Sequence, residues 1–428
     1  MRYRRAGLAK ALACTAVVAL AATACGSGGS TTTSDGKTVL TIATFNEFGY
    51  EELLKEYEAA NPNIKIEQRK TGQAAPHHQN LFAKLTAGSG LADVEGVEEG
   101  YLAKVMAQSS KFEDLKKIGP SDVREDRWLQ WKVDAVTTKD GKLIGYGTDI
   151  GPLAMCYRKD LLEAANMPSD PEGVKALFET WDSYFAAGEQ YVKATGKAWF
   201  DSASQVFNPM HNQEKVGYFD SDDKLAIETN NDKNIFDKVV KAVEGGQSAK
   251  LVAWSDEWKR GFKESAFATK VCPSWMLGGI RENSGPEHKG KWAVSASFPG
   301  GGGNWGGSYL TVPTQGKNKE EAAKLAAWLT APEQQIKAFK AKGTFPSQTQ
   351  ALISPELLNQ TDEYFGGEKV GLLFAEQANK VPAAQYKGPE DGAIQENIVS
   401  PALQSVEQGV SGAEAWGKVV EGAKKAAK

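Results

Sequence analysis

The feature that most constrains the fold of this chain is an alternation of strand and helix patterns over residues 38–107. Residues 38–45 are rich in β-branched side chains and predict a strand, and apolar residues at helical spacing predict a helix over 51–60. The pattern continues with strands at 64–66 and 91–97 and with helices at 80–87 and 101–107. Such alternation predicts βαβ units and a parallel sheet that is covered on both faces by helices.

The rest of the chain is long enough for a second domain. Near residue 152 we expect the chain to leave its first α/β unit. The further predicted elements are a strand at 153–157, a helix at 159–165, a helix capped by Thr180, and helical segments at 258–268, 319–329, 331–341 and, with an interruption, 371–409. His77-His78 is predicted to lie in a solvated loop, and Trp128 and Trp131 are predicted core residues.

Residues 1–24 have the pattern of a secretory signal peptide. Four basic residues precede an apolar run at 11–24, which is shorter than the roughly 20 residues of a membrane-spanning helix. Small residues then lead to Cys25 and a Gly/Ser/Thr tract, which resembles the bacterial lipoprotein signal, although Ala22 stands where Leu or Val is usual. We therefore expect lipidation of Cys25, with a soluble secreted protein cut near the same place as the alternative.

Charge and motifs exclude several classes of function. Without residues 1–24 the chain has 46 Lys and Arg against 54 Asp and Glu, which argues against nucleic acid as a partner. The four histidines form no zinc motif, and the phosphate-binding loop, dinucleotide and serine-hydrolase motifs are missing from the sequence. We expect no catalytic residue, metal or cofactor. Cys156 and Cys272 lie in strand-like runs and are either paired or buried free thiols.

Polar side chains follow the predicted strands. Ligands of open α/β sheets bind beyond the carboxyl ends of the strands. This rule selects Asn46 and Glu47 after the first strand, Glu95 and Glu98 at the third, and Asp149 after the strand at 144–147. These side chains are therefore candidate ligand contacts.

Two tryptophans stand among glycines. Trp275 precedes Met-Leu-Gly-Gly, and Trp305 follows four consecutive glycines and an asparagine. An indole ring on backbone that bends easily can be held against a ligand, where it offers a flat apolar face and an N–H donor. The alternative is that both rings fill the core. The polar end of a strand at Asp201 is a further candidate.

Taken in order, these segments resemble the family 1 extracellular solute-binding proteins of ABC transporters. The resemblance covers the whole chain after the signal peptide and is strongest to the cellobiose- and cellotriose-binding lipoproteins of actinomycetes. Its motifs are EELLKEYEAANP (51–62), LADVEGV (91–97), TDIGP (148–152), CYRKDLL (156–162), TWDS (180–183) and NWGGS (304–308). The departure is Ile150, where the family's turn has Thr.

The resemblance implies a periplasmic-binding-protein-like α/β fold with two lobes, a hinge and a ligand cleft between them. The implied division is a signal peptide at 1–24, a lipidated Cys and tether at 25–36, a first lobe at 37–151 and 311–345, a second lobe at 152–310, and a C-terminal helical region at 346–428 shared between the lobes. It also implies ligand-binding roles for the residues already named. Asp149 and Trp305 match motifs of the family, and Trp275 falls where the family often has a stacking aromatic. Tyr386 is a further candidate, because it lies in a late loop that often adds another ring.

The implied function is delivery of an oligosaccharide, cellobiose or cellotriose, to the membrane permease of an ABC importer. The protein would be a monomer on the extracellular face of the cell membrane, held there by its lipid alone. Two alternatives remain. One is the same fold binding another solute, such as another oligosaccharide, a polyamine or a glycerophosphodiester. The other is a secreted glycosidase, although no carboxylate pair is marked in the sequence.

Overall fold

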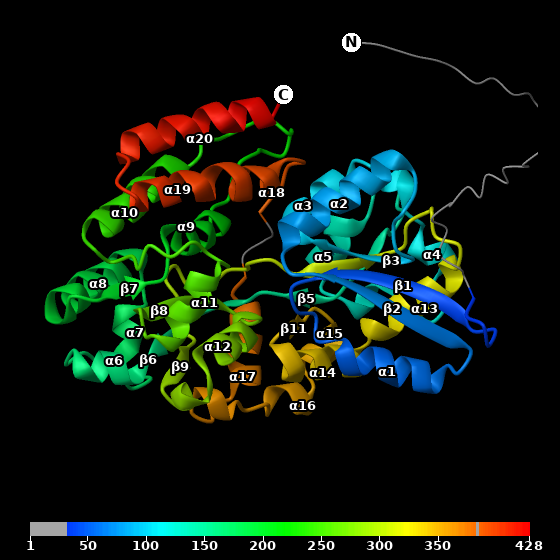
Figure 1. Cartoon of the computed structure of the whole chain (residues 1–428), viewed down its shortest axis with the longest axis horizontal. Helices are drawn as coiled ribbons and strands as arrows, with labels where there is room; N and C mark the ends of the chain where they lie inside the picture. The colour runs from blue at the N-terminus through cyan, green and yellow to red at the C-terminus, as the bar shows by residue number, and fades with distance from the viewer. Residues whose placement is uncertain (1–31, 382–384) are drawn as a thin grey trace, which may run out of the picture.

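The computed structural model describes residues 32–381 and 385–428, so the predicted signal peptide and Cys25 lie outside the described residues. The elements gather into two lobes (Figure 1). The first lobe contains the N-terminal elements and a return segment near residue 310, and the second contains the middle and the C-terminal elements. Within the described residues, no helix has the length and apolar character needed to cross a membrane.

The sheet of the first lobe is mixed. Its strands are β1 (Thr38–Phe45), β2 (Ile64–Thr71), β3 (Val94–Glu98), β4 (Gly145–Gly147) and β10 (Ser308–Thr311), in the order β2-β1-β3-β10-β4. β2 and β3 run parallel to β1, as predicted, whereas β10 is antiparallel to both of its neighbours. The expectation of a purely parallel sheet is therefore wrong, because β10 enters this sheet on the chain's return from the second lobe.

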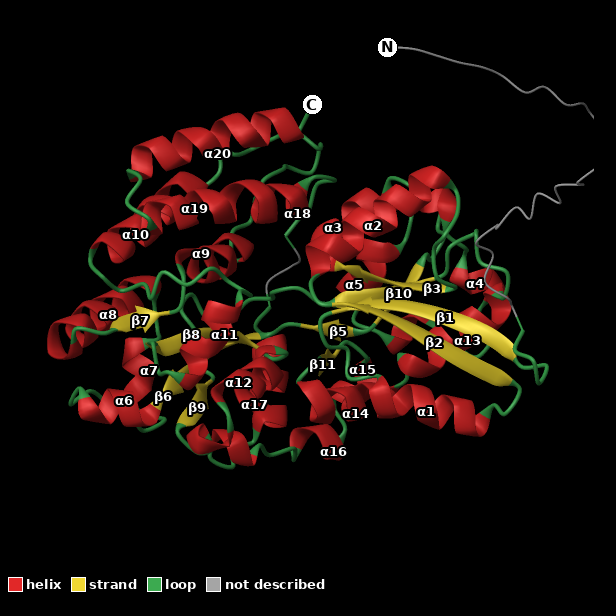
Figure 2. Cartoon of the chain, in the orientation of Figure 1, coloured by secondary structure: helices red, strands yellow, loops and turns green. Residues whose placement is uncertain are grey.

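Helices cover both faces of this sheet (Figure 2). They are α1 (Glu51–Ala60), α2 (Ala74–Ala87), α3 (Glu99–Met106), α4 (Leu115–Ile118), α5 (Gln130–Val136) and α13 (Lys319–Leu329). α1 and α13 have the predicted bounds. α2 begins six residues before the predicted start, so His77 and His78 are buried helix residues and the predicted solvated loop is wrong. Pro76 does not prevent this helix, because in the first turn its missing N–H costs nothing.

The second lobe has a sheet with the order β7-β8-β6-β9. Its strands are β6 (Leu153–Arg158), β7 (Ala198–Phe200), β8 (Phe267–Pro273) and β9 (Trp292–Ser295). Successive side chains of a strand point to opposite faces. Met155 and Tyr157 accordingly belong to one hydrophobic core, and Ala154 and Cys156 belong to another. The second lobe is therefore a sheet between two helical layers.

One layer packs on the Met155 face and the other on the Cys156 face. The first contains α6 (Lys159–Ala164), α7 (Gly173–Leu177), α8 (Trp181–Thr195), α9 (Ala203–Asn212), α10 (Asp232–Glu244), α18 (Asp391–Ile394), α19 (Ser400–Glu407) and α20 (Gly412–Ala426). The second contains α11 (Asp256–Lys263), α12 (Met276–Ser284), α14 (Pro332–Lys342), α15 (Thr349–Leu352), α16 (Pro355–Leu358) and α17 (Val370–Ala378).

The predicted cap of Thr180 is present as a capping box with Ser183. The predicted helix over 258–268 is wrong in its last part. α11 ends at Lys263, Ser265 adopts a left-handed φ of 56°, and β8 begins at Phe267. Trp128 is buried against Tyr146 as predicted, with ring centroids 5.0 Å apart, whereas Trp131 is only half-buried.

Three segments cross between the lobes. One is the chain from β4 to β6, which includes β5 (Asp149–Ile150), and another is the loop that leads into β10. The third contains β11 (Phe345–Pro346), which pairs antiparallel with β5. Because β10 starts at Ser308, residues 308–310 lie in the sheet of the first lobe and not in the second lobe as expected.

The C-terminal region lies mainly on the second lobe and touches the first at α15 and at α18. The Thr349 hydroxyl of α15 donates to the Asp126 carbonyl oxygen at 3.2 Å. Helices α15–α17 and α18–α20 contribute to the two cores of the second lobe. α18 approaches α3 so closely that a Cβ added at Gly392 would lie 2.8 Å from the Gly100 carbonyl oxygen. Lys104 and Glu390 form an ion pair of 2.8 Å beside this contact.

Cys156 and Cys272 form a disulfide, which decides between the two readings of these residues. It joins β6 to β8 in the centre of the second sheet, and both cysteines are fully buried. The bridge closes a loop with a sequence separation of 116 residues. It therefore restricts the unfolded chain strongly.

We expect the double substitution Cys156→Ala/Cys272→Ala to lower the free energy of unfolding by about 2–4 kcal/mol. Urea unfolding followed by tryptophan fluorescence, with and without a reducing agent, measures this loss. The reducing agent should destabilise the wild-type protein and leave the double variant unchanged. An unchanged wild-type midpoint, with both thiols shown to be reduced, would contradict the stabilising role of the bridge.

Candidate functional site

The carboxyl end of β3 presents two neighbouring carboxylates. Glu98 caps α3 by accepting a hydrogen bond from the Gly100 N–H (2.8 Å), and its own N–H donates to Nε2 of His78 (3.0 Å). Burial, together with Glu99 and Glu396, raises the pKa of Glu98 to about 8. Burial also raises the pKa of Glu99, against the opposing charges of Lys132 and Lys387. This end of β3 can therefore both accept hydrogen bonds from a ligand and donate them to it.

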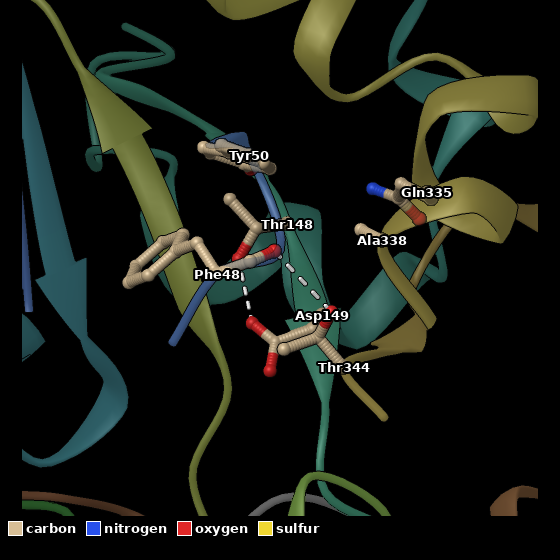
Figure 3. Close-up of a pocket in the computed structure, with 7 residues that line it drawn as sticks. All are labelled: Phe48, Tyr50, Thr148, Asp149, Gln335, Ala338 and Thr344. Carbon is tan, nitrogen blue, oxygen red and sulfur yellow. Dashed lines mark hydrogen bonds between the residues drawn. The ribbon is translucent and has the colours of Figure 1, made fainter. Parts of the chain in front are cut away.

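Asp149 lies in the crossing strand β5 and is buried. Its Oδ1 accepts hydrogen bonds from the Thr148 hydroxyl (2.6 Å) and the Ser308 N–H (3.0 Å). The carboxylate borders a small recess between the first lobe and α14 (Figure 3). The residues that line this recess are Phe48, Tyr50, Thr148, Asp149, Gln335, Ala338 and Thr344.

A buried lysine compensates part of this negative charge. Nζ of Lys132 lies 3.3 Å from the Ser308 carbonyl oxygen and 3.8 Å from the ring centroid of Tyr309. Burial lowers the pKa of Lys132, whereas Glu99 and Asp149 act in the opposite direction. Our sequence reasoning missed Lys132, since it comes from α5 and not from a strand end.

Trp305 and Trp275 are brought together from two parts of the second lobe. The Trp305 N–H donates to the Gly151 carbonyl (2.8 Å), and Nε1 of Trp275 donates to the Trp305 carbonyl (3.0 Å). The two rings are 5.8 Å apart at an interplanar angle of 79°, and both are half-buried. A Cβ at Gly151 would lie 2.0 Å from the Trp305 carbonyl oxygen, so this approach requires glycine.

The carboxylates and the indoles meet around Gly306-Gly307. A Cβ placed on Gly306 would lie 3.4 Å from Oε1 of Glu98 and 3.9 Å from Nε1 of Trp275. Gly307 has a φ of 113°, and a Cβ there would lie 2.6 Å from the Asp149 carbonyl oxygen. We call the residues gathered around this dipeptide the junction site. They are Glu98, Glu99, Asp149, Trp275 and Trp305.

A third indole, Trp254, extends the pair of rings and was missed from the sequence. Its ring centroid lies 6.0 Å from that of Trp275 and 4.9 Å from that of Trp258. Trp254 has a φ of 71°, which is unusual for a bulky side chain and persists only where the surroundings impose it. In the sequence, no glycine flanks Trp254, so nothing distinguishes it from a core tryptophan.

Asp201 lies behind the rings. It is buried, pairs with the buried Lys270 at 3.0 Å, and accepts a hydrogen bond from Nε1 of Trp258 at 2.7 Å. Nζ of Lys270 in turn lies 5.9 Å from the ring centroid of Trp305. The structure therefore places Asp201 in a buried supporting network behind the half-buried rings of the junction site.

The other candidates are not brought into the junction site by their contacts. Asn46 is exposed with a left-handed φ of 44°, and Glu47 pairs with Lys70 and Lys342. Tyr386 is 39% exposed and donates a hydrogen bond to Asp223. Glu95 is buried inside the sheet, since β3 continues to Glu98. Glu95 accepts a hydrogen bond from the Ala92 N–H at 2.7 Å.

Glu95 provides a test by pH. Burial, the largest cause, raises the pKa of its carboxyl from 4.5 to about 7. The folded protein thus keeps this proton to a higher pH than the unfolded chain does. The contribution of Glu95 to folding stability is therefore fully present below pH 4.5, and it is lost as the pH rises to about 7. We expect Glu95→Gln to be more stable than wild type at pH 8, by about 1–3 kcal/mol.

At pH 4.5 the two proteins should have nearly equal stability, because both carry an uncharged side chain at this position in the folded state. Urea unfolding at the two pH values gives the difference. A difference that does not change with pH would show that Glu95 ionises alike in the folded and unfolded states.

The two lobes and the crossing strands between them define a periplasmic-binding-protein-like α/β fold, as predicted. A crystal structure described as an extracellular solute-binding protein family 1 superposes with a TM-score of 0.80 at 49% sequence identity, covering 91% of this chain and 100% of that one. A binding protein of an ABC transporter from B. animalis subsp. lactis Bl-04, in complex with β-1,6-galactobiose, shares the fold with a TM-score of 0.77 at 22% identity, covering 90% and 98%.

Residues 52–363 match the model of the bacterial extracellular solute-binding protein family. The chain belongs to this family. The arabinooligosaccharide-binding protein of Bacillus subtilis (strain 168) is 29% identical to it over 403 residues, which cover 86% of this chain and 88% of that protein. The prediction of a binding protein rather than an enzyme is confirmed by this family. Within residues 32–381 and 385–428, no group of three or more His, Cys, Asp or Glu is placed to hold a metal ion.

Proposed function

We propose that this protein binds an oligosaccharide at the junction site and delivers it to the permease of an ABC importer. The observation that supports this most directly is the position of Gly306, which lies between a carboxylate of the first lobe, Glu98, and an indole of the second, Trp275. A ligand at this place would contact both lobes at once.

The two kinds of side chain suit the two kinds of surface on a sugar. Carboxylates accept hydrogen bonds from hydroxyl groups, which need partners when closure of the lobes removes water. Indole faces cover the C–H groups of a pyranose ring. A ligand that bridges the lobes stabilises the closed form, and that form is the state a permease would recognise.

Cellobiose and cellotriose are our first candidates, because their equatorial hydroxyls give a flat chain with apolar faces for stacking. An arabino-oligosaccharide is the second candidate, since a relative that matches most of this chain carries that name. A glycerophosphodiester is disfavoured, because the junction site offers three carboxylates and the nearby lysines already have partners. Lys132 lies against Ser308 and Tyr309, Lys270 pairs with Asp201, and Lys387 pairs with Asp391. The titrations below would detect binding of a polyamine, and they would also detect hydrolysis of a glycoside.

The protein would act outside the cell as a lipid-anchored monomer. Its family is extracellular, and a buried disulfide is typical of an oxidising compartment. The anchor would be the lipidated Cys25, which precedes the first described residue by a Gly/Ser/Thr tract. The partner would be the membrane permease.

Calorimetric titration against cellobiose, cellotriose, arabinotriose, maltose, xylobiose, trehalose and spermidine should give tight binding to cello-oligosaccharides. Trp305→Ala should weaken this binding at least tenfold, or about 1.4 kcal/mol, and should leave the ligand-free melting temperature nearly unchanged. Trp328→Ala is the matched control, because Trp328 is also half-buried but packs on Tyr57 in the first lobe.

Heat from arabinotriose alone would replace the first candidate with the second. Binding of spermidine alone, or release of monosaccharide during the titration, would contradict the proposed function. A large fall in the ligand-free melting temperature of Trp305→Ala would show that this ring is a core residue.

Cys25→Ala should release the protein from the cells into the medium, because the proposed anchor is a lipid on this residue. Fractionation of cells that express each form, followed by immunoblotting, measures the change. Continued attachment of the variant to the membrane would contradict lipidation at Cys25.

A further inference from the structure

The side chain of Asn304 joins three segments of the junction site. Its Oδ1 accepts a hydrogen bond from the Gly151 N–H at 2.9 Å. Its Nδ2 donates to Oε2 of Glu99 at 2.8 Å and to the Gly306 carbonyl at 2.8 Å. One amide thus contacts a crossing segment, a carboxylate of the first lobe, and the loop that holds Trp305.

Each of these segments carries a part of the junction site. Gly151 follows Asp149 by two residues, Glu99 follows Glu98, and Gly306 follows Trp305. Backbone bonds run alongside the amide, from the Trp305 N–H to the Gly151 carbonyl (2.8 Å) and from the Glu99 N–H to the Gly307 carbonyl (3.0 Å). The amide is the side-chain connection between the Glu99 carboxylate and this backbone.

The contacts require a group with one acceptor and two donors. An asparagine amide supplies both, whereas an aspartate carboxylate supplies acceptors alone. Aspartate at this position would still accept from Gly151 but would bring a second carboxylate against Glu99. The hydrogen-bond pattern therefore also fixes which way the amide of Asn304 faces.

We propose that Asn304 is the positioning residue that holds the Glu99 carboxylate and the Trp305 loop in the arrangement that binds ligand. This inference rests on the proposed function. It adds a residue that acts through others and sets the orientation of groups from both lobes.

Four charged groups around Glu99 affect its ionisation, so a test of Asn304 must leave them unchanged. Lys132 from α5 and Lys387 from the segment before α18 favour its ionised form, and Asp149 from β5 opposes it. Glu98 is its neighbour on the same turn and interacts with it as a like charge. None of these four is altered in the variants below, so their contribution is shared by all of them.

The test compares Asn304→Asp, Glu99→Gln and the double substitution Asn304→Asp/Glu99→Gln. Titrations with the oligosaccharide that binds the wild-type protein are made at pH 5 and pH 8. At pH 8 we expect Asn304→Asp to bind at least tenfold more weakly than wild type, because two carboxylates face each other. At pH 5 most of the loss should be recovered, because the pair can share one proton.

The double substitution should restore the contact between residues 304 and 99, since a glutamine amide at residue 99 can donate to the new carboxylate. The Gly306 carbonyl loses its donor in both variants that carry Asp at residue 304. At pH 8 we expect the double variant to bind the oligosaccharide at least fivefold more tightly than Asn304→Asp. Its affinity should change between pH 5 and pH 8 no more than the affinity of Glu99→Gln does. A purely structural loss would give neither the recovery at low pH nor the rescue. Wild-type affinity in Asn304→Asp, or a double variant as weak as Asn304→Asp at both pH values, would overturn the proposal.

Hydrogen exchange of the ligand-free protein supplies a readout that does not depend on the sugar. The amides of Gly151 and Glu99 should exchange faster in Asn304→Asp at pH 8 and should be protected again in the double variant. If no oligosaccharide binds the wild-type protein, the proposed function fails, and this exchange pattern alone decides the role of Asn304. Unchanged protection of both amides in Asn304→Asp would overturn that role even if every variant binds sugar.

Discussion

The arrangement of the junction site depends on the pairing of two crossing segments, 148–153 and 303–308. Three backbone hydrogen bonds hold the segments together, from Thr148 to Ser308, from Leu153 to Gly303 and from Trp305 to Gly151. The first segment brings Asp149 from the strand side, and the second brings Trp305 from the glycine-rich side. Because both cross between the lobes, the pairing places the acidic and the aromatic parts of the junction site next to each other at the hinge.

Lysines compensate the buried negative charge on each side of that pairing. Lys132 and Lys387 act on Glu99, and Lys270 pairs with Asp201 behind Trp305. A buried charge without a partner costs several kcal/mol, so the Lys270–Asp201 pair needs both of its members. Burial and acidic neighbours raise the pKa of Glu98 to about 8. Near neutral pH this carboxyl can therefore both accept a hydrogen bond from a sugar hydroxyl and donate one to it.

The sequence predicted those helices well whose ends and faces are encoded by neighbouring residues. The bounds of α1 and α13 followed from helical spacing and a stop signal, and the grouping of Glu98, Asp149, Trp275 and Trp305 agrees with the strand-end rule and the glycine context. Other placements depend on partners far apart in the chain. β10 is antiparallel to its neighbours, Thr311 of β10 lies beside Glu95, and Lys270 pairs with Asp201. No neighbouring residue in the sequence indicates that Trp254 and Lys132 lie next to the junction site.

The central claim is that one ligand contacts both lobes at the junction site. A crystal structure of the protein with cellotriose, or with whichever oligosaccharide the titrations select, tests this most directly. We expect a sugar ring against the face of Trp305 or Trp275, with hydroxyls within hydrogen-bond distance of Glu98 or Asp149. A sugar bound to one lobe alone, or bound away from these four side chains, would contradict the claim.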